Sequence, residues 1–306
     1  MSEFQYYEFV AVDRPLTPAA MRALRAITSR ATITPTRLVN TYQWGDFKGD
    51  PLALVTRYFD AFLYYANWGT HRLMLRLPRA APAARTAARY CGSGRVRGGG
   101  GSAVVHAAAR HVILEFQSED ESGEWEGEPE GWLGSLIPLR DTLAGGDVRA
   151  LYLAWLLRAQ VGELRGATRE PPVPAGLGAL TAPLDALVDF LRLDRALLAA
   201  AAERSAPAPK PPTAAAVRRW VRTLDPAARD AWLERAALED GPGLRAEFHD
   251  AIASARGTGR RTATGAAEPA ARTVAELLRD ADARRTAGGR PPNRPRAPDA
   301  WEWDDA

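Results

Sequence analysis

A short loop after a predicted strand carries the side chains best suited to bind a charged ligand. Residues 44–50 (WGDFKGD) combine two carboxylates, a lysine and two aromatic rings. Loops that a rigid scaffold positions often hold binding sites. Four residues are candidates for an anion-recognising site: Arg14, Trp44, Asp46 and Lys48. A structural interpretation stays open, in which Asp50 caps a helix, the glycines form turns and the aromatic rings fill the core.

Two blocks of opposite charge follow one another in the chain. Residues 61–114 contain eight arginines and no acid, whereas residues 115–139 contain eight acids and no basic residue. Within a compact domain such blocks neutralise each other at short range, although each exposed pair contributes only about 0–1 kcal/mol. Three interpretations stay open: two solvated loops, an acidic loop that covers a basic surface until a polyanion displaces it, and an acidic loop that docks a basic protein.

Four arginines of the basic block are candidates for contact with a polyanion such as nucleic acid. Two lie on one face of a predicted strand and two lie in a glycine-rich loop: Arg72, Arg76, Arg95 and Arg97. The strand face is alternatively covered by the helical region or by solvent. Consecutive glycine amides can cradle phosphate, but the loop at 92–102 lacks the known phosphate-loop spacings and precedes a strand rather than a helix. We therefore favour a flexible insertion at this loop. Nucleic acid stays an alternative partner, which the arginines would contact through its phosphate backbone.

The C-terminal segment carries an acidic sequence with two tryptophans. Five arginines precede Trp301 and Trp303, which stand among acids. Tryptophans outside a core are typical of the residues that dominate protein interfaces. We expect residues 287–306 to be disordered and to offer a peptide to a protein partner. The alternative is a tail without a binding role.

No residue type and spacing in the chain matches a catalytic or metal-binding motif that we trust. The four histidines show no metal-ligand spacing: His71, His106, His111 and His249. Ser135 lacks a nucleophile elbow, and Cys91, the single cysteine, has no histidine partner by motif. We therefore predict no catalytic residue, no metal and no cofactor, and the sequence favours a protein that is not an enzyme.

Alternating strand and helix signals over the first 116 residues predict the scaffold that positions these groups. Aromatic and β-branched runs indicate strands at 4–12, 33–43, 71–77, 103–108 and 111–116. A cap residue followed by proline begins helices at Pro18 and Pro51. We predict that the second helix continues to Ala66, because apolar residues recur at helical spacing. This order predicts the α+β class, with a mixed sheet and helices on one face.

From Trp132 onward the strand signal disappears and we expect helices. Helical patterns cover 148–161, 183–191 and 194–203, and three short amphipathic helices begin near Thr213, Asp225 and Gly243. Thr273 and Glu276 form a capping box that starts one more helix. We divide the chain into an α+β domain at 1–131, a helical domain at 132–204, a proline-rich linker at 205–212, short helices at 213–286 with a disordered stretch at 255–271, and a disordered tail at 287–306.

Composition bears on two points: where the protein is located, and what its net charge implies about binding. The 306 residues are 46% hydrophobic, and no run approaches the roughly 18 apolar residues of a membrane span. The first residues lack the basic start and apolar core of a secretory signal, so we expect a cytoplasmic protein without membrane contact. There are 38 arginines and two lysines, a skew typical of a GC-rich genome, and the net charge of +3 permits only weak attraction to polyanions.

Four segments resemble a family of uncharacterised proteins from high-GC bacteria. They are YYEFVAVDRPLTPAAMRALRAITSRATITPTRLVN, WGDFKGDP, RYFDAFLYYANWGTHRLMLRLP and GWLGSLIPLRDTLAGGDVRALYLAWLLRAQ. The resemblance covers residues 4–77 and roughly 131–200. Because this family has no known activity, cofactor or site residues, the resemblance implies a cytoplasmic bacterial protein and nothing about chemistry.

The sequence therefore favours a non-enzymatic bacterial accessory protein. We expect an adaptor that acts through its charged surfaces and its tryptophan-containing tail, with a protein partner that the sequence does not identify. Two alternatives stay open. One is a small-molecule or anion-binding enzyme or sensor with a pocket near residues 44–50, and the other is an auxiliary nucleic acid-binding protein.

Overall fold

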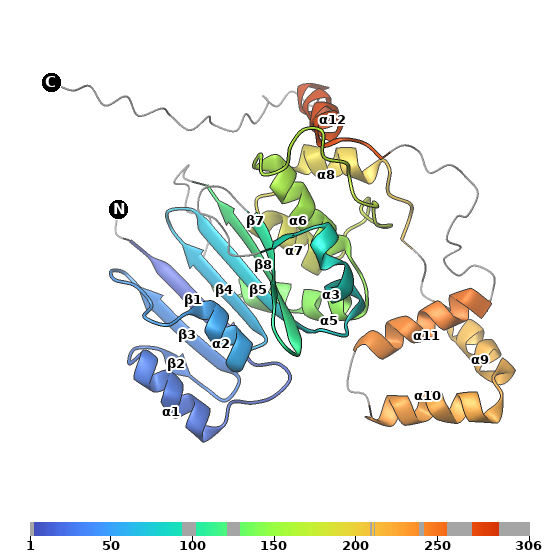
Figure 1. The fold of residues 1–306 in the computed structure, drawn as a ribbon, viewed down its shortest axis with the longest axis horizontal. Coiled ribbons are helices and arrows are strands. Elements are labelled where there is room, and N and C mark those ends of the chain that lie inside the picture. The colour runs from blue at the N-terminus through green and yellow to red at the C-terminus, as the bar shows by residue number, and fades with distance from the viewer. Residues whose placement is uncertain are drawn as a thin grey trace.

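An eight-stranded mixed sheet occupies the N-terminal half of the chain (Figure 1). The computed structural model describes residues 3–93, 102–120, 129–208, 210, 212–238, 242–255 and 271–287. The strands lie in the order β2-β3-β1-β4-β5-β8-β7-β6, and all neighbours are antiparallel except β6 and β7. Their bounds are β1 Gln5–Val10, β2 Thr32–Ile33, β3 Arg37–Tyr42, β4 Ala61–Ala66, β5 Thr70–Pro78, β6 Gly92–Ser93, β7 Ser102–Ala107 and β8 His111–Glu119.

The strand β4 corrects one prediction. We expected a helix from Pro51 to Ala66, whereas helix α2 spans only Pro51–Arg57 and the chain continues as a central strand. Because β4 is covered on both faces, its apolar residues form a continuous run that also satisfies helical spacing. Gly69 forms the turn into β5 with a φ of 102°, and a Cβ atom at this position would clash with the Asp120 carbonyl oxygen.

Two hydrophobic cores lie on opposite faces of this sheet. The first is built from alternate strand residues such as Phe9, Phe62 and Met74 and is covered by α1 (Pro18–Ile27) and α2. Both helices begin as predicted, with Thr17 and Asp50 as side-chain caps before a proline. The intervening strand residues face the second core, which the later helices cover.

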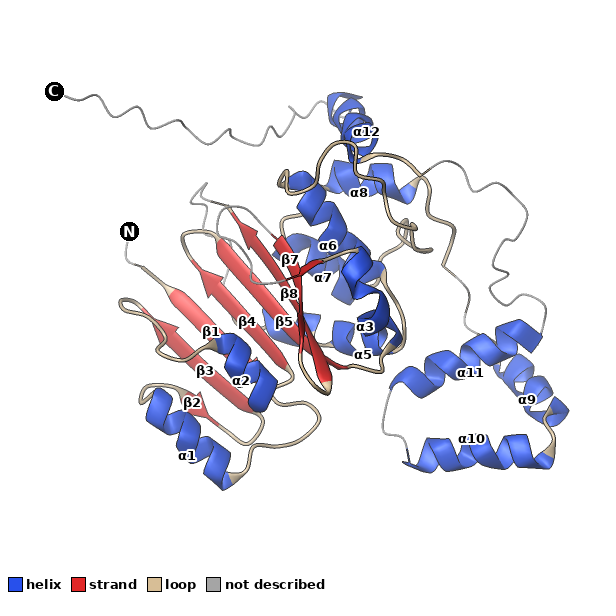
Figure 2. Ribbon diagram, viewed as in Figure 1, coloured by secondary structure: helices blue, strands red, loops and turns tan. Residues whose placement is uncertain are grey.

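The later part of the chain is helical, as predicted (Figure 2). The buried helix α6 and its neighbours pack against the second sheet face and share its core. Their bounds are α3 Pro82–Thr86, α4 Trp132–Leu136, α5 Pro138–Ala144, α6 Arg149–Gln160, α7 Ala182–Phe190 and α8 Arg195–Ala202, with a short 3₁₀ helix at Ala87–Arg89. The α+β class is therefore confirmed.

Three further helices form a small group of their own (Figure 1). They are α9 Ala214–Thr223, α10 Pro226–Leu238 and α11 Pro242–Ala255. Each contributes one ring to an aromatic cluster of Trp220, Trp232 and Phe248, whose ring centroids lie 4.8–5.9 Å apart. Helix α11 contacts α5, and the last helix, α12 (Val274–Ala287), packs on α8.

Several predictions concern segments outside the described residues. These are most of the glycine-rich loop, most of the acidic loop, most of the stretch predicted as disordered at 255–271, and residues 288–306 of the tail. The division of the chain at residues 131, 204 and 212 stays a prediction. Among the residues that the structure describes, no helix combines the length and the apolar character needed to cross a bilayer.

The two faces of β4 give a first testable prediction. Phe62 and Leu63 are neighbours in sequence, yet both are fully buried, each in a different core. Phe62→Ala and Leu63→Ala should each lower the free energy of unfolding by about 2–5 kcal/mol, measured by urea denaturation. Trp68, an exposed residue of the turn between β4 and β5, provides the control: Trp68→Ala should change the free energy of unfolding by about 0.5 kcal/mol. A cost below about 1 kcal/mol for either core variant would contradict a strand that is buried on both faces.

Candidate functional site

The loop at residues 44–50 is attached to the sheet by its aromatic and acidic side chains. Phe47 is buried against Tyr7 and Phe9, and the Asp46 carboxylate accepts a hydrogen bond from Gln5 Nε2 at 3.2 Å. The Trp44 ring is 67% exposed and is covered on one side by the Arg30 guanidinium at 4.8 Å. Lys48 is exposed. The structural interpretation therefore holds for Phe47, which fills the core, but not for Trp44, which lies at the surface.

Arg14 does not join this loop. In the antiparallel pair of β1 and β3, Gln5 lies opposite Tyr42 and Val10 lies opposite Arg37. Asp46 is therefore attached at the Gln5 end of β1, whereas Arg14 follows its Val10 end. At about 3.3 Å per residue the strand separates the two ends by about 17 Å. The register leaves Trp44, Asp46 and Lys48 near one another and places Arg14 elsewhere.

Arg76 is neutralised within the protein. Its Nη2 and Nε atoms donate to Asp60 Oδ1 at 2.5 and 3.1 Å. Burial alone would raise the pKa of Asp60, but hydrogen bonds from the Asp13 and Val12 N–H groups and from Arg76 outweigh burial and lower it. Arg140 from α5 donates to the Arg76 carbonyl oxygen at 2.9 Å. Asp60 thus compensates the side-chain charge that we expected to contact a polyanion, and the Arg76 main chain helps to join the sheet to α5.

Arg72 has a comparable internal partner in Glu115. This carboxylate is 1% exposed and accepts hydrogen bonds from Arg72 Nε and His106 Nε2. Burial raises the pKa of Glu115, yet His106 and Arg72 together hold it below its ordinary value. The sequence motifs did not predict this cluster. The predicted hairpin of the strands at 103–108 and 111–116 contained the signal, because its register places His106 and Glu115 on the same face.

The other reactive side chains are held in structural roles. Burial raises the pKa of the Cys91 thiol to about 12, so it stays protonated at neutral pH. His71 Nδ1 donates to the Phe190 carbonyl oxygen at 2.7 Å, and its Nε2 accepts from Arg192 at 2.8 Å. Within the described ranges, no group of three His, Cys, Asp or Glu side chains could hold a metal ion. Arg95, Arg97, Trp301 and Trp303 lie outside the described residues.

An apolar groove on the α9–α11 group is the surface that best fits a macromolecular ligand. Its volume is about 530 Å³. Leu233 on α10 is 62% exposed at its rim, and the aromatic cluster supports its floor. Arg229 and His249 also line the groove, and no carboxylate does among the described lining residues. The described lining residues are Val221, Leu224, Arg229, Trp232, Leu233, Ala236, Leu244, Phe248 and His249.

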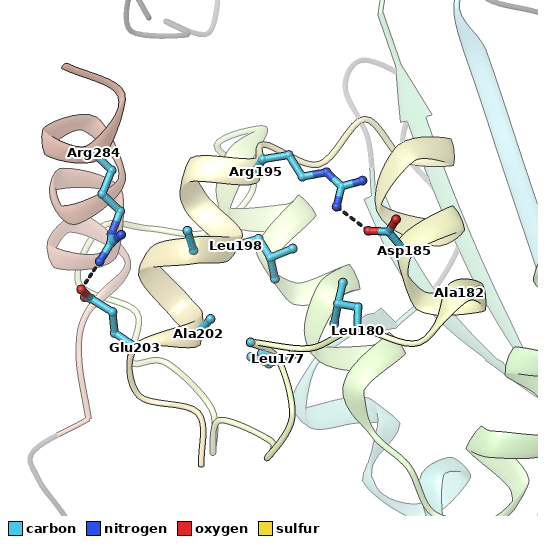
Figure 3. A pocket seen from close by; sticks show the side chains of 11 residues that line it. Leu177, Leu180, Ala182, Asp185, Arg195, Leu198, Ala202, Glu203 and Arg284 are labelled. Atoms are coloured by element: carbon cyan, nitrogen blue, oxygen red, sulfur yellow. Dashed lines mark hydrogen bonds and ion pairs between the residues drawn. The ribbon is translucent and has the colours of Figure 1, made fainter. Parts of the chain in front are cut away.

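A second hollow of about 670 Å³ lies between α7, α8 and α12 (Figure 3). Its wall is formed by apolar side chains such as Leu177, Leu180 and Leu198. Two ion pairs stand at its edges, Arg195 with Asp185 and Arg284 with Glu203. Because each arginine of the described lining faces an acid of that lining, the described residues do not select a charged ligand.

Comparisons of the chain with protein-family models, curated proteins and solved structures find no match. The resemblance to uncharacterised proteins of high-GC bacteria therefore stays a prediction.

The His71 contacts generate a prediction about pH. Burial, with the Arg192 guanidinium second, lowers the pKa of His71 from 6.5 to about 4. Between pH 6.5 and about 4, His71 is protonated in the unfolded chain and neutral in the folded chain. Lowering the pH through this range therefore stabilises the unfolded chain, and the free energy of unfolding should fall. His71→Gln keeps a polar neutral side chain and should flatten this slope, measured by urea denaturation across that range. Equal slopes in the two proteins would contradict a neutral buried His71.

Proposed function

We propose that the chain is an adaptor protein whose α9–α11 groove binds an amphipathic helix of an acidic partner protein. The observation that carries this proposal is the solvent-open apolar groove, with Leu233 presented at its rim. Apolar grooves between helices are a recurrent way to bind the apolar face of a partner helix. The bacterial origin and the cytoplasmic location expected from the sequence belong to this proposal.

Helix α10 supports the proposal because none of its 13 residues is buried. A helix of this length is marginal in water unless its apolar face packs on something. Within the described residues, α10 contacts the aromatic cluster through Trp232, which is half-buried, and α11 through an ion pair of Arg235 with Glu247 at 2.8 Å. A partner helix over Leu233 would bury the apolar surface that α10 leaves open.

Charge favours an acidic occupant. Arg229 is the charged residue of the lining, and it lies among apolar side chains without a lining carboxylate in the described part of the groove. A guanidinium at an interface rim steers association with negatively charged partners and sets their orientation. The charge blocks and the Trp301–Trp303 tail stay predicted as further contact surfaces of the same adaptor.

Site-specific photo-crosslinking from α10 tests the proposal. Leu233 lines the groove, whereas Leu238 on the same helix is 83% exposed and is not a lining residue. With benzoylphenylalanine at position 233 in the native host, we expect one protein adduct whose crosslinked segment is an acidic amphipathic helix. The same group at position 238 should give this adduct weakly or not at all. Mass spectrometry of the adducts identifies the segment.

Three outcomes would contradict the proposed partner. Equal crosslinking from positions 233 and 238 would mean that the groove does not select its occupant. An adduct to a second copy of the chain would make the groove a self-association surface. An adduct to residues 288–306 would make the groove the binding site of the chain's own tail.

A further inference from the structure

One side of α9 carries arginines and no acid. Arg218, Arg219 and Arg222 follow one another closely along this helix, and all three side chains are exposed. At about 100° per residue, the three occupy one side of the helix, opposite Trp220. We call the surface formed by these three arginines the basic face of α9. The adaptor proposal does not use it.

The opposite side of α9 is packed within the chain. Trp220 is 8% exposed, and its ring lies edge-on to that of Phe248 on α11, with the centroids 4.8 Å apart. Val221 and Leu224 line the apolar groove. Because packing fixes this side of the helix, the basic face points away from the aromatic cluster and into solvent.

The described residues do not compensate the charges of the basic face. None of its three guanidinium groups forms a hydrogen bond or an ion pair with the part of the chain that the structure describes. Helix α9 contains no acid. The nearest acid along the chain is Asp225, which caps α10 by accepting a hydrogen bond from the Ala228 N–H at 2.8 Å. These arginines thus differ from Arg72, Arg76 and Arg272, which pair with buried carboxylates.

We infer that the basic face of α9 binds the phosphate backbone of double-stranded nucleic acid without reading its sequence. Arginine presents N–H donors in a planar fork that matches phosphate oxygens, and each such hydrogen bond is strengthened by charge. Contacts to phosphate supply affinity and orientation but carry no information about the bases. Three arginines on one side of a helix therefore suit a regular row of phosphates.

Two other polyanions fit this face less well. Single-stranded nucleic acid is held largely by stacking of its bases on aromatic rings. The aromatic residue of α9 is Trp220, which is buried on the other side of the helix. A basic helix that binds a lipid surface places its apolar side among the headgroups, whereas this side of α9 packs against Phe248. The backbone of a duplex requires only the exposed charges.

The basic face and the groove can be occupied at the same time. Val221 and Leu224 line the groove, whereas the three arginines of the basic face are not lining residues. An adaptor with both surfaces would hold a partner helix and a nucleic acid on different sides of α9. The inference does not rest on the groove, because the arginines are exposed without any partner in it.

Fluorescence anisotropy of a labelled DNA duplex of about 20 base pairs, titrated with the full chain at about 50–200 mM NaCl, tests the inference. Three neutralised phosphates predict that log K falls against log salt with a slope of about −2.7 or steeper. Arg218→Gln and Arg222→Gln should each make the slope shallower by about 1 and weaken binding about 8-fold at about 0.1 M salt, since each removes one phosphate contact.

Two control variants separate a local contact from a general loss of charge. Arg165, on the segment between α6 and α7, is also exposed. Arg165→Gln should therefore keep the duplex affinity within about 2-fold and leave the slope unchanged. Arg222→Lys keeps the positive charge and should keep the slope of the original chain. Circular dichroism melts verify that all variants fold.

Further arms of the titration identify the polyanion. Affinities within about 3-fold for two duplexes of unrelated sequence would support the inference, whereas a larger preference would show readout of bases and overturn it. Tighter binding of a single-stranded oligonucleotide or of phosphatidylserine vesicles, with the same arginine dependence, would also overturn it. So would an absence of duplex binding at about 50 mM salt, or an equal loss in Arg165→Gln. The Leu233 adducts test the adaptor proposal separately.

Discussion

Buried carboxylates paired with arginine are the constraint on which the rest of the structure depends. Asp60, Glu115 and Glu170 are almost fully enclosed, and each accepts hydrogen bonds from an arginine of another element. A buried ion costs several kcal/mol unless its partner is held in good geometry. These pairs therefore fix the positions of the elements that carry them. Asp60 and Arg76 join the start of β4 to β5, and Glu170 joins α6 to the segment before α12.

This constraint gives several arginines a structural role. Arg72, Arg76 and Arg272 have their charges compensated inside the protein, so the number of arginines says little about binding. What matters is the balance at each surface. Among the described lining residues, the hollow of Figure 3 pairs each arginine with an acid, and the α9–α11 groove is apolar and includes Arg229. The two surfaces therefore differ in the charge that they present to a ligand.

Local signals in the sequence were sufficient for most elements, and tertiary packing decided the rest. The sequence predicted the helix starts because each depends on a few adjacent residues: the caps Thr17 and Asp50 and the capping box of Thr273 and Glu276. The strand β4 was missed because burial on both faces removes alternation. The side chains of the α9–α11 groove come from three helices, which only the fold brings together. The separation of Arg14 from Asp46 likewise follows from strand register rather than from composition.

The central claim is that buried arginine–carboxylate pairs, rather than exposed ones, hold the layers together. A double-mutant cycle on Glu170 and Arg272 tests it most directly, by urea denaturation of Glu170→Gln, Arg272→Met and the double variant. The account predicts that each single substitution lowers the free energy of unfolding by about 3–5 kcal/mol. The decrease in the double variant should be smaller than the sum of the two single decreases by about 2 kcal/mol or more. Losses that add within about 0.5 kcal/mol would show that the two side chains do not depend on each other, and would contradict the account.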